Sequence, residues 1–261
     1  NNKKQKKFQM NTYENQHFVA DSNLKCLADA KQVLLIQKTD WAECICPICD
    51  LPNEYDIFLT DETYTQTLTQ IGTIVEKSNI CCSICCRQFR QFESRTMIGG
   101  TEVAQTERPY KIPSPCLANF GPCKQQIEVK KNGQNLGGSE WPCWCNTLCC
   151  FRGFCSCQEL DVTDSVGNVA YRISSKCLQC GYLLPVCFCF QSCARRHYPI
   201  KNTNGQVVGE ITNICNGVCL ELCTKADKFA VRFPAECTTE QKLIILQTAM
   251  FIDYLQYESF C

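Results

Sequence analysis

Cysteine is the residue in this chain whose type and spacing could do the most chemistry. The 261 residues include 26 cysteines, and many gather in short clusters, such as the CCSICC run from Cys81 to Cys86. Clustered thiols serve as disulfides, metal ligands, nucleophiles, acylation sites or small buried hydrophobes. The compartment and the function of the protein depend on which of these roles applies.

Disulfides and zinc are two roles that the spacing leaves open. Adjacent cysteines such as Cys81 and Cys82 do not readily bond to each other, and a chain of this length can build a core without disulfides. Segments 44–49 and 177–180 read C-x-C-x-x-C and C-x-x-C, which are half-site spacings for Zn²⁺. Two half-sites at one rim of the fold would complete a four-cysteine site, so structural Zn²⁺ remains a lower-ranked cofactor.

A cysteine nucleophile needs a base, and the chain offers only two histidines, His17 and His197. His17 lies in a polar N-terminal stretch, and His197 follows two arginines in a segment expected to form a strand. The sequence contains no metalloprotease motif, Gly-rich phosphate loop or nucleophile elbow. We therefore expect no catalytic residues.

S-acylation competes with simple burial as the role of the clusters. Aromatic residues flank several of them, as in WPCWC (141–145) and VCFCF (186–190). More than one acyl chain makes membrane attachment stable, and Trp and Phe suit the headgroup level. The lipidation candidates are Cys81, Cys82, Cys85, Cys86, Cys116, Cys123, Cys149, Cys150, Cys187 and Cys189.

Hairpin signals alternate with the cysteine clusters along the chain. Turn pairs occur at Gly99-Gly100, Asn132-Gly133, Gly167-Asn168 and Asn204-Gly205, between stretches that alternate apolar and polar residues. A further hairpin over 54–76 and strands near 33–36 and 229–233 bring the expected total to about twelve strands. In a meander of hairpins the tight turns point one way, so the cysteine-bearing connectors should gather at the opposite rim.

The last stretch of the chain predicts a buried helix over about 239–257. Thr238 and Gln241 form a capping-box pattern at its start. Apolar side chains then cover nearly every face, so the helix needs burial on all sides, which a closed barrel around it supplies. A membrane span is disfavoured by the shortness of the segment and by Asp253. The expected buried residues are Leu243, Leu246, Met250, Phe251, Asp253 and Tyr254.

Charge and the N-terminus set the remaining expectations from composition. Because 26 basic residues balance 26 acidic ones, we expect no nucleic-acid partner. Residues 1–25 form a polar, basic extension without the apolar stretch of a secretory signal, and we expect it to be extended. Residues 26–261 are expected to form one domain, mainly β, with the helix inside.

The order of landmarks resembles the phospholipid scramblase family. Asn53-Glu54-Tyr55-Asp56-Ile57, the cysteine pairs of 81–86, and Arg108-Pro109 follow in the family's order. Gln126-Ile127-Glu128-Val129 and Trp141-x-Cys143 come next. The segment ADKFAVRFP (226–234) and Phe251-Ile252-Asp253-Tyr254 complete the set. The resemblance covers roughly residues 26–258.

This resemblance implies a Tubby-like fold, a closed twelve-stranded antiparallel barrel that encloses a hydrophobic C-terminal α-helix. It also implies membrane association, palmitoylated cysteines, and Ca²⁺ binding near the last strand. Lipid scrambling, rather than enzymatic catalysis, is the implied activity.

Two departures from the family pattern change these expectations. Lys225 stands where the family's calcium loop has an Asp, leaving Asp227 and Glu236 as a degenerate metal site, so we expect weak or absent Ca²⁺ binding. The family's compact cysteine block is reduced to Cys116 and Cys123, while cysteines have multiplied in other connectors. Lipidation sites therefore do not carry over one by one.

The sequence supports two functions of different classes. In the first, the protein binds or scrambles lipids on the cytosolic face of a membrane, anchored through acylated cysteines, with membrane lipids as partners. In the second, it is a non-catalytic structural or adaptor subunit that reuses the fold, with other protein subunits as partners in a cytoskeletal, ciliary or organellar assembly.

Overall fold

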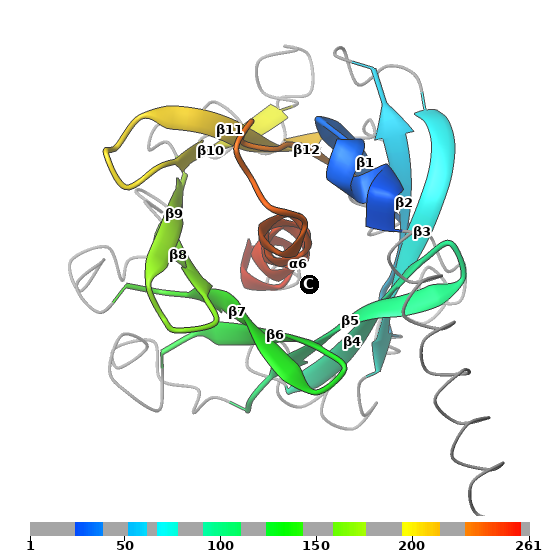
Figure 1. The fold of residues 1–261 in the computed structure, drawn as a ribbon, viewed down its shortest axis with the longest axis horizontal. Coiled ribbons are helices and arrows are strands. Elements are labelled where there is room, and N and C mark those ends of the chain that lie inside the picture. The colour runs from blue at the N-terminus through cyan, green and yellow to red at the C-terminus, as the bar shows by residue number, and fades with distance from the viewer. Residues whose placement is uncertain are drawn as a thin grey trace, which may run out of the picture.

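In a computed structural model of the chain, the described residues form twelve β-strands, one long α-helix and a short N-terminal helix (Figure 1). The structure describes residues 24–38, 52–61, 67–77, 91–110, 124–142, 159–175, 195–214 and 228–256. In chain order, the elements are β1 (Gln32–Gln37), β2 (Glu54–Thr60), β3 (Thr67–Lys77), β4 (Phe92–Ile98), β5 (Thr101–Arg108), β6 (Gln126–Lys131), β7 (Gln134–Glu140), β8 (Glu159–Asp164), β9 (Val169–Ser174), β10 (Arg195–Lys201), β11 (Val207–Ile214), β12 (Lys228–Arg232) and α6 (Thr239–Gln256).

The strands form a closed antiparallel barrel in which each strand pairs with its neighbours in the chain. Closure comes from β1, which pairs with β2 on one side and with β12 on the other. In the described part of the chain, every strand has a partner strand on both sides, and such closure protects an all-β domain against association through open edges. The predicted twelve-stranded barrel around a C-terminal helix is confirmed.

The strand connections divide the barrel into two different ends. Connections from even to odd strands are mostly short, as at Gly99-Gly100 and Asn132-Gly133, where Asn132 and Gly133 have φ of 51° and 78°. Positive φ at both central residues suits the tight turns that antiparallel hairpins prefer. Connections from odd to even strands are the cysteine-bearing segments. We call the two ends the turn mouth and the connector mouth.

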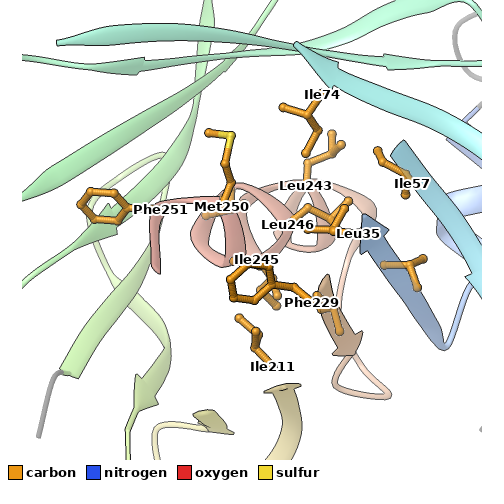
Figure 2. Close-up of a cluster of buried hydrophobic side chains, with 14 of the residues drawn as sticks. Leu35, Ile57, Ile74, Ile211, Phe229, Leu243, Ile245, Leu246, Met250 and Phe251 are labelled. Atoms are coloured by element: carbon orange, nitrogen blue, oxygen red, sulfur yellow. The ribbon is translucent and has the colours of Figure 1, made fainter. Parts of the chain in front are cut away.

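The helix α6 runs through the bore of the barrel, from the turn mouth to the connector mouth (Figure 1). Its 18 residues correspond to about 27 Å of helix. Strand residues that point inward, including Leu35, Ile57 and Phe229, surround its side chains (Figure 2). The helix therefore buries every face, as its sequence requires, and Leu243, Leu246, Met250, Phe251, Asp253 and Tyr254 are all buried.

The capping box predicted at the start of α6 is present. The backbone N–H of Gln241 donates to Thr238 Oγ1 at 3.3 Å, and the backbone N–H of Thr238 donates to Gln241 Oε1 at 3.0 Å. These two bonds satisfy donors that a helix N-terminus otherwise leaves open. They fix where the chain turns from β12 into the bore.

A short helix over residues 24–29, which the sequence patterns do not predict, covers the turn mouth. Its side chains Leu24 and Leu27 are buried. Lys242, in the first turn of α6, donates from Nζ to the carbonyl oxygens of Leu27 at 3.2 Å and Ala30 at 2.8 Å, and also to Ala28. A cation at the C-terminus of a helix bonds to the last carbonyl groups and interacts favourably with the helix dipole. Lys242 therefore connects the helix over 24–29 to α6.

Replacing Lys242 with Met should therefore weaken closure of the turn mouth. We expect K242M to lower the free energy of unfolding by about 1–3 kcal/mol, because buried carbonyls lose their donor. Urea denaturation measures the loss, and hydrogen exchange should show faster exchange in residues 24–29. The control is K31M at an exposed lysine in the same region. Equal effects of the two substitutions would contradict the role of Lys242.

Candidate functional site

The candidate site is the connector mouth, because the cysteine-bearing segments leave the barrel there. Segments 39–51, 78–90, 111–123, 143–158, 176–194 and 215–227 each join an odd strand to the next even strand. In an antiparallel barrel these strand ends share one rim, so the described residues that flank the segments all lie at that rim. The gathering of the cysteines themselves stays a prediction. The cysteines within the segments lie outside the described residues.

The C-terminal end of α6 is held in this mouth by buried hydrogen bonds. Tyr55, at the start of β2, donates its hydroxyl proton to Asp253. Tyr254 donates to Glu76, near the end of β3, and accepts a bond from Asn53 Nδ2 at 3.1 Å. The backbone N–H of Asn53 donates to the same Glu76 carboxylate at 2.9 Å. These bonds tie the end of α6 to β2 and β3.

A buried arginine completes the polar layer. Arg108, at the end of β5, is only 2% exposed, and its Nη2 donates to Gln125 Oε1 at 2.6 Å. Its Cζ lies 5.3 Å from the ring centre of Phe251, 5.7 Å from that of Phe92 and 5.8 Å from that of Tyr254. Aromatic faces attract a guanidinium, and the attraction is stronger when water is excluded. The cation is thus placed in the same layer as the Glu76 and Asp253 carboxylates.

This layer explains why segments far apart in the sequence carry the scramblase resemblance together. Asn53 and Tyr55 of the first segment bond to Tyr254 and Asp253 of the last, almost 200 residues later. Arg108 packs against the ring of Tyr254. Three of the motifs are therefore parts of one contact.

The outer surface of the same mouth carries a row of alternating charged and apolar side chains. Strand register places Arg195 beside Ile214, Ile214 beside Lys228, and Lys228 beside Ile36. All four are half-exposed, and their sequence neighbours, such as Leu35 and Phe229, point inward. Among the described residues, neither Arg195 nor Lys228 forms an ion pair. We call these four residues the basic row.

The two cysteines that the structure describes lie at the opposite mouth. Cys26 is exposed on the helix over 24–29, and Cys237 is partly buried in the turn between β12 and α6. Burial raises the pKa of the Cys237 thiol to about 11, and burial is also the main reason that the pKa of Tyr171 rises to about 12. The Cys237 thiol is therefore almost entirely protonated at neutral pH, which disfavours it as a nucleophile or metal ligand.

The other predicted site residues are placed as follows. All ten lipidation candidates and Asp227 lie outside the described residues. Glu236 is exposed at the turn mouth, whereas Lys228, the neighbour of Asp227, begins β12 at the connector mouth. The pairing of Asp227 with Glu236 as a metal site therefore stays a prediction. Within the parts of the chain that the structure covers, no three His, Cys, Asp or Glu side chains group as a metal site would require.

Sequence reasoning missed Glu76, Asn53, Arg108 and Gln125 as members of a single layer. Their positions gave one signal. Glu76 lies two residues after the buried Ile74, and Arg108 lies two residues after the buried Thr106, so each points to the inner face of its strand. A charged residue at an inward position near a strand end indicates a buried partner. The partner itself lies too far along the chain to be named from such a pattern.

Comparison with known proteins identifies the family. A family model named Scramblase matches residues 10–259. The chain belongs to the scramblase family. It is 26% identical over 238 residues to a bovine protein named phospholipid scramblase 2, covering 90% of this chain and 71% of the relative. It is 25% identical to human phospholipid scramblase 1 and 27% identical to the mouse protein of that name, covering 66% and 63% of their lengths. No solved structure matches the chain.

The barrel and central helix that the resemblance to scramblases implied are both present in the structure. Among the residues described, no helix combines the length and the apolarity needed to cross a bilayer. The longest helix that the structure describes, α6, forms the core of the barrel.

Breaking the bond between Tyr55 and Asp253 should destabilise the fold. We expect Y55F and D253L each to lower the free energy of unfolding by about 1–3 kcal/mol, because each leaves a buried polar group without its partner. Chemical denaturation measures the change. Y110F removes a hydroxyl from a tyrosine that is 47% exposed and serves as the matched control. Unchanged stability of both buried variants would show that the bond does not hold the end of α6.

Proposed function

We propose that this scramblase-family protein binds the surface of an anionic membrane through its connector mouth and acts there on lipids. The observation that carries the proposal is the segregation of strand connections. The strand ends that flank the six cysteine-bearing segments all lie at one mouth, and the basic row lies on the outer wall of that mouth. Lipidation and electrostatic attraction would then act on the same side of the molecule.

The chemistry of the basic row suits a lipid headgroup. Arg195 and Lys228 provide two cations for phosphate oxygens, and Ile214 and Ile36 provide apolar contact beside them. A basic side chain near an anionic bilayer contributes about 1 kcal/mol to binding, and an acyl chain adds the burial of its methylene groups. Neither term alone gives stable attachment, whereas the two together do. Palmitoylation of the connector cysteines is therefore part of the proposal.

Removing the positive charge at either end of β12 tests whether the connector mouth is the end that faces the membrane. We expect K228Q and R195Q each to weaken binding to vesicles that contain phosphatidylserine by about fivefold, from a contribution of about 1 kcal/mol. The control is R232Q, because Arg232 ends the same strand at the turn mouth. Vesicle co-sedimentation at several salt concentrations measures the affinity, with calcium and then with a chelator.

Several outcomes would count against this orientation. Equal loss in R232Q would show that binding depends on net charge rather than on the connector mouth. Binding that requires calcium would show that the metal, rather than the basic row, provides the attraction, despite Lys225 in the loop. Equal binding to vesicles of neutral phosphatidylcholine would remove the electrostatic part of the proposal.

Acyl-exchange labelling tests the lipidation part separately. We expect native protein to be labelled after hydroxylamine treatment, with the modified peptides drawn from the connector segments and not from Cys26 or Cys237 at the turn mouth. Mass spectrometry of the labelled peptides locates the sites. Absence of label would contradict acylation, and retention of the native protein in a detergent-insoluble fraction would favour an assembly subunit instead.

A further inference from the structure

The strand β3 extends beyond the wall of the barrel at the turn mouth. It pairs with β2 from Thr67 onward, but its pairing with β4 begins only at Gly72, opposite Ile98. The turn between β4 and β5 ends the contact with one bond, from the backbone N–H of Gly99 to the Ile71 carbonyl at 3.0 Å. Over Thr67–Gln70, the edge of β3 on the β4 side therefore has no strand partner among the described residues.

This segment is open to solvent. All four residues from Thr67 to Gln70 are exposed, and Leu68 is 61% exposed. Other strands also have short stretches without a described partner on one side, such as Thr101–Ala104 of β5, but β3 combines such a stretch with four consecutive exposed residues. An unpaired edge presents backbone N–H and C=O groups in the spacing that another strand can bind.

The sequence of the segment lacks the features that usually prevent strand addition. From Thr63 to Val75 the chain reads TYTQTLTQIGTIV, with no charged residue and no proline. Natural edge strands commonly carry Lys or Pro at such positions. Two register shifts between β2 and β3 do interrupt the strand, at Ile57/Phe58 and Phe58/Thr60. Irregularity of this kind limits the edge to one short added strand and disfavours open-ended stacking.

We propose that the exposed edge of β3 pairs with the same edge of a second copy of this chain, antiparallel and across a two-fold axis. The two-fold places Thr69 opposite Thr69 of the second copy and Leu68 opposite Gln70. Identical surfaces that meet in this way are self-complementary, and the contact closes at two copies. Because the segment carries no charge, two copies approach without like charges facing each other.

The lack of charge also distinguishes a second copy from other occupants. The edge residues themselves offer no charge to a basic or acidic peptide, and the Asp56 carboxylate beside them already accepts from Gln70 Nε2 at 2.7 Å and pairs with Lys38. An identical uncharged strand loses nothing by comparison. The edge lies at the turn mouth, opposite the cysteine-bearing segments. The inference does not rest on the proposed membrane binding, although that binding would leave this edge free.

The contact is small, so the dimer should be reversible. Leu68, Thr69 and Gln70 of each copy form only a short two-stranded pairing, well below the area of a stable protein interface. Association should therefore depend on protein concentration over the range that sedimentation measures. The amide protons of Thr67–Gln70 should become more protected from exchange as concentration rises.

Charged substitutions at one threonine give a direct test. We expect the full chain, kept reduced, to self-associate in a sedimentation-velocity dilution series. T69K should weaken the association by about tenfold or more, because two lysines then face each other across the axis. T73K is the matched control, since Thr73 lies on the same strand but is paired with both β2 and β4. T73K should associate like the unmodified chain.

Mixing variants separates pairing from unfolding. T69K and T69E should each be monomeric when alone, with unchanged thermal unfolding, and an equal mixture should associate because opposite charges then meet. A chain that stays monomeric at every concentration would overturn the proposal. An equal effect of T73K, or a mixture of T69K and T69E that fails to associate, would also overturn it.

Discussion

The structure depends on one constraint: α6 is apolar on every side and must be shielded from water all round. An apolar helix of this kind is stable only where every side is buried. A sheet on one side would leave half of the helix exposed, whereas a closed barrel surrounds it. Closure in turn requires β1 to reach β12. The helix and the ring of strands therefore stabilise each other, and neither is a plausible fold alone.

Polar groups inside the bore fix how the helix sits within that ring. Apolar packing is not directional, so it does not by itself set the depth or rotation of α6. Lys242 bonds to the helix over 24–29 at one end, and Asp253 and Tyr254 bond to β2 and β3 at the other. Between them, Gln247 Nε2 donates to Thr96 Oγ1 at 2.7 Å, and its Oε1 accepts from the Ser94 hydroxyl. Hydrogen-bonded polar groups of this kind specify one arrangement of the core, whereas apolar contacts alone would allow several.

The sequence predicted the parts of the fold that depend on local patterns. Alternation along the strands, the turn pairs and the capping box of Thr238 and Gln241 all act within a few residues, so the barrel and the start of α6 were foreseeable. The layer of Arg108, Glu76 and Tyr254 was not, because its members meet only after the whole ring has closed. The helix over 24–29 was missed for the same reason, since its stability comes from the distant Lys242. The connector mouth followed from topology, although the chemistry of its cysteines rests on segments that the structure does not describe.

The position of α6 in the chain has a consequence for synthesis on the ribosome. The segment around which every strand packs is translated after all twelve of them. Until it emerges, half-apolar strands have no core to cover, and the pairing of β1 with β12 joins residues about 200 positions apart. Folding of this kind is slow, and apolar surface and unpaired strand edges stay exposed until α6 has been translated. Nascent chains of this protein should therefore be long-lived clients of chaperones.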